Sequence, residues 1–292
     1  MSVQLPMSDR AVVAADTSEA AQEIAAELAY KRLLMVNVVF IGPRHAADRG
    51  WTMVDAGLAG TAGAIRRAAA ERFGPASRPS AIILTHGHFD HVGALGALAE
   101  TWDAPIYAHP LEAPYLTGRS AYPPPDPKVG GGTLAMLSRF YPRGPIDVSK
   151  RLKSLPPGGA IPHLPEWRWI ATPGHSVGHV SLWRERDRVL VAGDAFVTTR
   201  QESAYAVARQ TAELHGPPAY FTVDWGASES SVRRLTELNP ELVVAGHGRP
   251  MRGEEMRAGL DRLAASFAAV AVPKRGRYVA APARVDDGSA YC

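Results

Sequence analysis

Four side chains that can bind a metal ion stand within six residues of one another: His86, His88, Asp90 and His91. They follow a short apolar run, which predicts a turn at the end of a strand. On such a turn the alternate side chains His86 and His88 can converge on one ion, while Asp90 and His91 point towards another. Imidazole and carboxylate ligands suit zinc, iron, manganese and cobalt. This spacing therefore indicates a metal centre rather than four independent histidine and aspartate residues.

Three further candidate ligands each follow an apolar run and a glycine: His175, Asp194 and His247. Each is expected on a tight turn where a strand ends, at the same edge of the sheets as the first four. Glycine at these turns lets the backbone come close to a metal. The one cysteine of the chain is Cys292, which excludes an internal disulfide, a thiolate metal site and a CxxC redox motif.

The rest of the pattern must position these residues, and it alternates between strands and helices. Apolar, β-branched runs predict strands, and Ala- and charge-rich stretches between turn residues predict helices. Strands are predicted at residues 33–41, 51–55, 81–84, 105–108, 167–172, 180–183, 188–194 and 242–247. Helices are predicted at residues 17–30, 62–73, 92–102, 203–214, 228–238 and 253–271. This order is typical of an α/β protein.

Two segments depart from that order. Residues 110–165 form a Pro/Gly-rich insert, with one short helix predicted at 133–140. The insert is either a solvated connection or a wall of a substrate pocket, since long loops in compact domains are often functional. Residues 273–292 are rich in Pro, Gly and charge and predict a flexible tail that is partly ordered at most.

The charge and the hydrophobicity of the sequence argue against some classes of binding partner. The formal net charge is +3, and no basic stripe is present, so a nucleic-acid partner is not expected. The longest apolar stretch, residues 33–41, is too short to span a bilayer, and no secretory signal pattern occurs at the start. We expect a cytoplasmic protein that acts on a small-molecule substrate without a membrane partner. The oligomeric state stays open.

Together these motifs resemble those of the metallo-β-lactamase superfamily. The resemblance rests on THGHFDH at residues 85–91, on His175, Asp194 and His247 in that order, and on VDAG at residues 54–57. It covers residues 30–270 and implies a four-layer αββα sandwich, an α/β (α+β) fold. In this fold the metals lie at one edge of the sandwich. The whole of residues 1–292 is expected to form a single domain of this type, including the insert and the tail.

The resemblance also implies a role for each ligand. Two divalent metal ions are expected, with zinc preferred and iron or manganese as alternatives. The first ion would be bound by His86, His88 and His175, and the second by Asp90, His91 and His247, with Asp194 bridging both. Asp55 would hold a ligand imidazole in its tautomer, as metal-binding histidines usually require.

Other residues near these motifs are expected to be structural. His179 and the hydroxyls of Thr85 and Thr172 are assigned to local hydrogen bonding. The histidines without a partner pattern are expected away from the site: His45, His109, His163 and His215. Core packing is favoured for Tyr205, Tyr220 and Trp225, and surface positions for Arg119, Arg139 and Arg143.

The implied chemistry is hydrolysis, in which a metal-bridging hydroxide attacks a carbonyl or phosphoryl centre. Asp90 is the predicted catalytic residue, because it can orient the hydroxide and pass a proton to the leaving group. Asp194 argues against a true β-lactamase, since those enzymes carry no bridging aspartate. The chain is most similar to glyoxalase II-like and lactonase-like hydrolases of esters, lactones or thioesters. The alternatives are a mononuclear-iron persulfide dioxygenase-like oxidoreductase, a phosphodiesterase and a non-enzymatic binding module.

Two departures concern the substrate. The helix that follows His247 is short for a glutathione-binding extension, which argues against specific glutathione recognition. Gly248 stands where acyl-homoserine lactonases usually have aspartate. The substrate therefore stays open between esters, lactones and thioesters.

Overall fold

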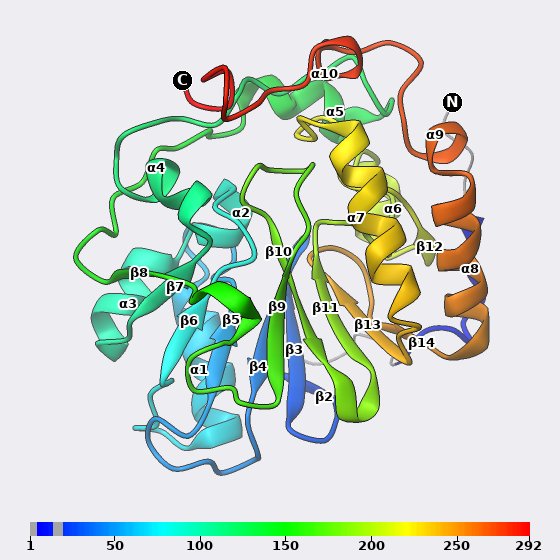
Figure 1. The fold of residues 1–292 in the computed structure, drawn as a ribbon. Coiled ribbons are helices and arrows are strands. Elements are labelled where there is room, and N and C mark those ends of the chain that lie inside the picture. Colours follow the sequence, from blue (N-terminus) through cyan, green and yellow to red (C-terminus); the bar gives the residue numbers. More distant parts are fainter. Residues whose placement is uncertain (1–4, 14–19) are drawn as a thin grey trace.

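Two β-sheets pack face to face, and helices cover the outer face of each sheet (Figure 1). The computed structural model describes residues 5–13 and 20–292. Helices α1 (Ala62–Phe73) and α3 (Leu95–Trp102) pack on one sheet, and α7 (Trp225–Glu237) and α8 (Gly253–Ala265) pack on the other. The predicted four-layer αββα sandwich is confirmed.

The larger sheet comes from the amino-terminal half of the chain, with the insert adding its last strand. Its strands lie in chain order: β2 (Gln22–Ala25), β3 (Leu28–Leu33), β4 (Val36–Ile41), β5 (Thr52–Val54), β6 (Ala81–Ile83), β7 (Ile106–Ala108) and β8 (Leu152–Ser154). Strands β2 to β5 pair antiparallel, and β5 to β8 pair parallel. The short helix α2 (Phe89–Val92) follows β6.

The smaller sheet has five strands from the carboxy-terminal half. Their order is β14 (Met251–Arg252), β13 (Leu242–Ala245), β11 (Val189–Gly193), β10 (Val180–Arg184) and β9 (Trp167–Ala171). Strands β11 and β13 are parallel neighbours, and the other pairs are antiparallel. Strands β1 (Leu5–Pro6) and β12 (Glu213–Leu214) form a separate pair beside α8.

Strand β4 shows how one sequence fills two cores. Val36, Val38 and Phe40 pack with α1 and α3 on the outer face. Val39 and Ile41 point the other way, into the core between the two sheets. Successive side chains of a strand face opposite sides of the sheet, so a continuous apolar run suits a strand buried on both faces. Full burial stabilises the fold by roughly 1.5–3 kcal/mol for each large apolar side chain.

The insert and the tail lie together at one end of the sandwich (Figure 1). The insert contains α4 (Ala113–Leu116), α5 (Thr133–Leu137) and β8, and the tail contains α10 (Arg277–Ala280). The Tyr115 hydroxyl donates to the Ala290 carbonyl at 2.6 Å, and the Tyr291 hydroxyl donates to the Leu111 carbonyl at 3.1 Å. The tail thus packs against the insert.

The prediction of a helix at residues 17–30 is wrong for residues 20–30, the part of this range that the structure describes. Residues 22–25 and 28–33 pair as antiparallel strands, and Glu27 makes the turn with a φ of 60°. Ile24 and Leu28 enter the core between the sheets. Helix propensity is a weak preference, and here strand pairing and core burial override it. Residues 17–19 lie outside the described residues.

Other boundaries also moved. The strand predicted at 33–41 is interrupted by a turn at Leu34, where φ is 60°, so β3 ends and β4 begins there. The helix predicted at 203–214 is the shorter α6 (Ala204–Arg209), and Gln210 at a φ of 50° ends it. The helix predicted at 253–271 breaks at Ser266 into α8 and α9 (Phe267–Val270). In the described ranges no helix has the length and apolar character needed to cross a membrane.

Candidate metal centre

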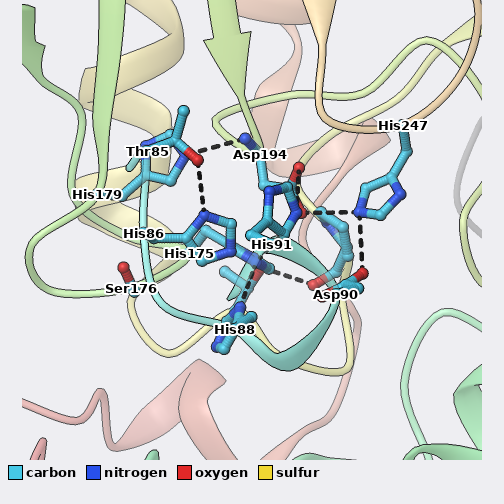
Figure 2. Close-up of polar contacts among 12 residues, drawn as sticks. Thr85, His86, His88, Asp90, His91, His175, Ser176, His179, Asp194 and His247 are labelled. Atoms are coloured by element: carbon cyan, nitrogen blue, oxygen red, sulfur yellow. Dashed lines mark hydrogen bonds and ion pairs between the residues drawn. The ribbon is translucent and has the colours of Figure 1, made fainter. Parts of the chain in front are cut away.

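The seven predicted ligands gather at one edge of the sandwich, on segments that follow strands, and two of them, Asp90 and His91, lie in α2. Residues 86–91 follow β6, and His175 follows β9. Asp194 follows β11 and His247 follows β13, and these two strands are parallel neighbours. The carboxyl ends of parallel strands meet at the same edge of a sheet, so loops distant in sequence converge there. Figure 2 shows the side chains turned towards one another.

The ligand atoms form three overlapping groups, and within each group they lie within 4.8 Å of one another. The groups are His86, His88 and His175; Asp90, His91 and His247; and His86, His91 and Asp194. All seven residues are buried. The group of His86, His88 and His175, called the first ligand group, has the composition predicted for one metal ion. The group of Asp90, His91 and His247, called the second ligand group, has the composition predicted for the other.

Asp194 lies between these two groups. Its Oδ2 is 3.4 Å from Nε2 of His175 in the first group and 3.1 Å from Nε2 of His247 in the second. Its Oδ1 is 3.6 Å from Nε2 of His91. Within the groups, Nδ1 of His88 is 2.9 Å from Nε2 of His175. The carboxylate therefore has the position that a bridging ligand requires.

Several of these atoms have no hydrogen-bond partner. Nε2 of His86, Nε2 of His91 and Oδ1 of Asp194 are buried and make no hydrogen bond, although the last two atoms lie 3.6 Å apart. A buried polar atom without a partner costs about 1–3 kcal/mol. All three point into the shared space of the ligand groups, where a cation would supply the missing partner. The donor set, nitrogen and oxygen only, fits zinc, iron or manganese.

The outer nitrogens of the rings are held by the protein. Asp55 Oδ2 lies 2.8 Å from Nδ1 of His91, which is the contact predicted for Asp55. The same carboxylate accepts the backbone N–H and the hydroxyl of Thr85, each at 2.8 Å. The Thr85 hydroxyl is also 3.0 Å from Nδ1 of His86. Such contacts fix the tautomer and orientation of a metal-binding imidazole.

Two further supports were not predicted. His247 Nδ1 lies 2.6 Å from the backbone carbonyl of Met35, and His175 Nδ1 lies 3.3 Å from the hydroxyl of Thr222. Met35 belongs to the turn between β3 and β4, so its contribution is a backbone atom that no residue pattern reveals. Thr222 follows the Pro217-Pro218 pair and has no signal of its own in the sequence.

His179 has the structural role predicted for it. Its Nδ1 lies 2.8 Å from the hydroxyl of Thr172, and its Nε2 accepts the backbone N–H of Asp194 at 2.9 Å. Burial lowers the pKa of His179 to about 4, so the ring is neutral and can accept that bond. The preceding Gly193 has a φ of 56°, and a Cβ there would lie 2.6 Å from Nε2 of His179.

The electrostatics of the ligands differ between the groups. Burial lowers the pKa of His86 and His88 well below the ordinary value, and that of His175 to about 3. These neutral rings keep lone pairs for a metal. Burial also opposes charge on His91 and His247, but neighbouring carboxylates together outweigh it and raise the pKa of both rings. These are Asp194 and Asp55 for His91, and Asp194 and Asp90 for His247.

Aromatic side chains from two segments cover the first group. The ring of Tyr122, in the insert, lies 4.3 Å from that of His88, and the ring of Phe221 lies 4.6 Å from it on a stacked plane. Tyr220 is buried next to Phe221. The insert therefore forms an aromatic wall beside the first ligand group, whereas its role in lining a substrate pocket stays a prediction. Tyr122 and Phe221 were not predicted, because aromatic residues in a Pro-rich segment carry no specific signal.

The remaining predicted residues lie elsewhere. None of His45, His109, His163 and His215 belongs to a ligand group among the described residues. Tyr205 is 74% exposed, whereas Tyr220 and Trp225 are buried. Arg119 and Arg139 are exposed, and the half-buried Arg143 donates to the Tyr122 carbonyl at 3.0 Å.

Comparisons with known proteins agree with this geometry. Residues 32–247 match the model of the Metallo-beta-lactamase superfamily. "Probable metallo-hydrolase YflN" of Bacillus subtilis (strain 168) is 47% identical over 230 residues, which are 79% of this chain and 87% of that protein. The structure of a beta-lactamase domain protein from Burkholderia ambifaria is 23% identical, with a TM-score of 0.61 over 89% of this chain and 78% of that chain.

The structure of TTHA1623 in a di-iron-bound form is 24% identical, with a TM-score of 0.50 over 76% of this chain and 92% of that chain. These solved structures share the fold. The matched residues 32–247 run through all seven candidate ligands. With this match and the similarity to YflN, the chain belongs to the metallo-β-lactamase superfamily.

Proposed function

We propose that the chain is a hydrolase with two metal ions that cleaves an ester, lactone or thioester, as glyoxalase II-like and lactonase-like enzymes do. The observation that carries the proposal is the place of Asp194, whose Oδ2 lies 3.4 Å from His175 and 3.1 Å from His247. A carboxylate in contact with both ligand groups can serve two cations at once. The metallo-hydrolase name of YflN supports the reaction class.

The first ligand group would hold one divalent cation and the second ligand group another. Two such cations supply a water of lowered pKa and polarise the oxygen of the substrate. Zinc is proposed because imidazole and carboxylate ligands are those of catalytic zinc sites. Iron is the alternative, since TTHA1623 has a di-iron-bound form.

Asp90 is proposed as the catalytic carboxylate. Its Oδ2 lies 3.5 Å from Nε2 of His247, at the second ligand group. Its side chain is 8% exposed, against 5% for Asp55 and 2% for Asp194. Asp90 is therefore the site aspartate that an incoming water reaches most easily. It would orient the attacking water and carry its proton to the leaving group.

The walls of the site favour an uncharged carbonyl substrate. Tyr122 and Phe221 pack against His88, and these aromatic faces suit an apolar acyl or lactone chain. These apolar surroundings support an ester, lactone or thioester over a phosphodiester, because burying the charge of a phosphate against them would be costly.

Metal analysis of the purified protein, with a substrate panel, tests this proposal. We expect two equivalents of metal and hydrolysis of at least one lactone, ester or thioester. The panel includes a chromogenic phosphodiester and glutathione persulfide with an oxygen electrode. One iron per chain with oxygen consumption would replace the hydrolase by a persulfide dioxygenase-like enzyme. A folded protein that binds no metal would overturn the proposal altogether.

A further inference from the structure

A buried glutamate of the insert joins the loops that carry the first ligand group. Glu112 ends a 3₁₀ turn directly after β7 and is fully buried. Its Oε1 accepts the backbone N–H of Gly178 at 2.9 Å and the hydroxyl of Ser176 at 2.8 Å. Its Oε2 accepts the backbone N–H of Gly87 at 3.0 Å and the hydroxyl of Tyr122. One carboxylate thus binds both ligand loops and the aromatic wall.

The bonded backbone groups stand next to the ligands. Gly87 separates His86 from His88, and Gly178 lies three residues after His175. A shift of Glu112 would therefore move all three members of the first group relative to one another. The contacts span 25 residues to Gly87 and 66 residues to Gly178, so no local turn could replace them.

The two glycines make room for this carboxylate and for its partner Tyr122. A Cβ at Gly87 would lie 2.7 Å from the Tyr122 hydroxyl oxygen and 3.6 Å from Oε2 of Glu112. A Cβ at Gly178 would lie 2.8 Å from both Cγ and Oε1 of Glu112. Neither glycine has a positive φ. Space for Tyr122 at Gly87 and for Glu112 at Gly178, rather than backbone conformation, therefore explains glycine at the two positions.

A carboxylate is costly to bury, and here its hydrogen bonds offset the cost. Burial raises the pKa of Glu112, while the Tyr122, Ser176, Gly87 and Gly178 donors oppose that rise. Hydrogen bonds to an ionised acceptor are roughly twice as strong as neutral ones. Because the four donors come from three segments, the carboxylate holds these segments at one separation.

The second ligand group is held by other residues. Asp55 contacts His91, and the Met35 carbonyl contacts His247. The backbone N–H of Ala56 donates to the His91 carbonyl at 2.7 Å. None of these contacts involves Glu112, so a change there can act on one group and spare the other.

We propose that Glu112 is a positioning residue that sets the geometry of His86, His88 and His175 and, through it, the affinity for the first metal ion. This inference rests on the proposed function, since it assumes a site for two ions. It adds a residue of the insert, which carries no ligand itself, to the groups that determine metal affinity.

The test compares zinc affinities of the wild type with those of Glu112→Gln and Glu112→Ala, measured by competition with a chromophoric chelator. We expect the first ion to bind roughly 10–100-fold more weakly in both variants, with the second unchanged. The amide of Gln keeps one acceptor oxygen, so Ala should lose more affinity than Gln. Tyr122→Phe removes the hydroxyl that donates to Glu112 and accepts from the Gly87 N–H at 2.8 Å, but it keeps the carboxylate and should lose least.

Cobalt substitution identifies which ion is lost. The visible spectrum of cobalt-loaded Glu112→Gln should match that of His88→Ala, which lacks one ligand of the first group. It should differ from that of His247→Ala, which lacks one ligand of the second group. A match to His247→Ala would overturn the proposal. The proposal would also be overturned if Glu112→Gln bound both ions as tightly as the wild type. In that case the proposed function would still stand, provided that the wild type binds two ions.

Leu98→Ala is the control for general destabilisation. Leu98 is buried on α3 among the apolar side chains that cover the larger sheet, and it makes none of the hydrogen bonds that hold the ligand groups. This variant should lower the Tm but keep both zinc affinities. An equal loss of the first ion in Leu98→Ala would show that lower stability alone explains the effect and would overturn the proposal. A wild type that binds no metal would remove the proposed function itself.

Discussion

The two ligand groups offer the same kinds of atoms but are supported differently. The second group is attached to the sheets, because Asp55 follows β5 and the Met35 carbonyl comes from the turn between β3 and β4. The first group is attached to the insert, because Glu112 and Tyr122 hold or cover its loops. Support by the sheets comes from residues at the ends of β3, β4 and β5, whereas support by the insert comes from the irregular segment between β7 and β8.

This difference in support suggests how proteins of this fold can differ in metal affinity and in substrate shape. Under the proposals made above, the insert would hold the first ligand group and also line the substrate site, which would link metal affinity to substrate shape. A change of insert would then alter both properties together. The sheet-held group would keep its geometry, because strand pairing and the core between the sheets fix the positions of Asp55 and Met35.

The largest effect is expected at Asp194, which belongs to both groups. Asp194→Asn replaces the shared carboxylate by an amide and leaves both groups without their common anion. We expect the loss in kcat/KM to exceed the roughly 10–100-fold typical of an outer partner, with fewer than two metal ions retained. Initial rates and metal analysis measure both. If this variant still bound two ions tightly, Asp194 would not be a ligand that both groups need.

Removal of metal by a chelator should be the next largest effect. Metal that binds only the native state stabilises it by about 2.7 kcal/mol when its free concentration is 100 times Kd. The Tm should therefore fall after dialysis against a chelator and recover with zinc. Stepwise return of one equivalent shows whether the two groups fill in order. A Tm that does not depend on metal would contradict a metal centre built from these seven residues.

Asp55→Asn tests the sheet-held group in the way that Glu112→Gln tests the insert-held group. The amide loses an acceptor for Nδ1 of His91, and we expect roughly 10–100-fold weaker binding at the second group. The first group should lose less, because Asp55 reaches His86 only through Thr85. Zinc competition and cobalt spectra separate the two ions. Equal losses would show that the groups are not supported independently.

The smallest effect is expected far from both groups, at the exposed ion pair of Asp48 and Arg78. Hydrogen bonding from Arg78 lowers the pKa of Asp48 to about 2. A lowered pKa means that the pair contributes stability above the unfolded-state value of 3.8 and loses it as the pH falls through about 2. Asp48→Asn should leave metal content unchanged and the Tm nearly so at neutral pH, because exposed pairs contribute little. Altered metal binding would show that remote surface charge also tunes the site.

Composition and turn residues predicted some helices correctly, but they failed where contacts between distant residues decide the structure. The helix predicted at 62–73 is α1, since its composition and the Gly74 stop are local features. Residues 20–30 have helical composition, yet they form β2 and β3 because pairing with β4 and burial in the core outweigh propensity. Glu112 was missed for a related reason, as its four hydrogen-bond donors lie up to 66 residues away.

The sequence by itself determined which residues can bind metal, because ligand chemistry resides in side-chain type and the close spacing of His86, His88, Asp90 and His91 requires no tertiary information. It also determined the family, through the order of His175, Asp194 and His247. Only the tertiary structure decided what holds each group in place. Met35 contributes a backbone carbonyl, which every residue type possesses. Glu112 acts through hydrogen bonds to residues that are distant in the sequence. Such support depends on distance in space, which a pattern of residues does not contain.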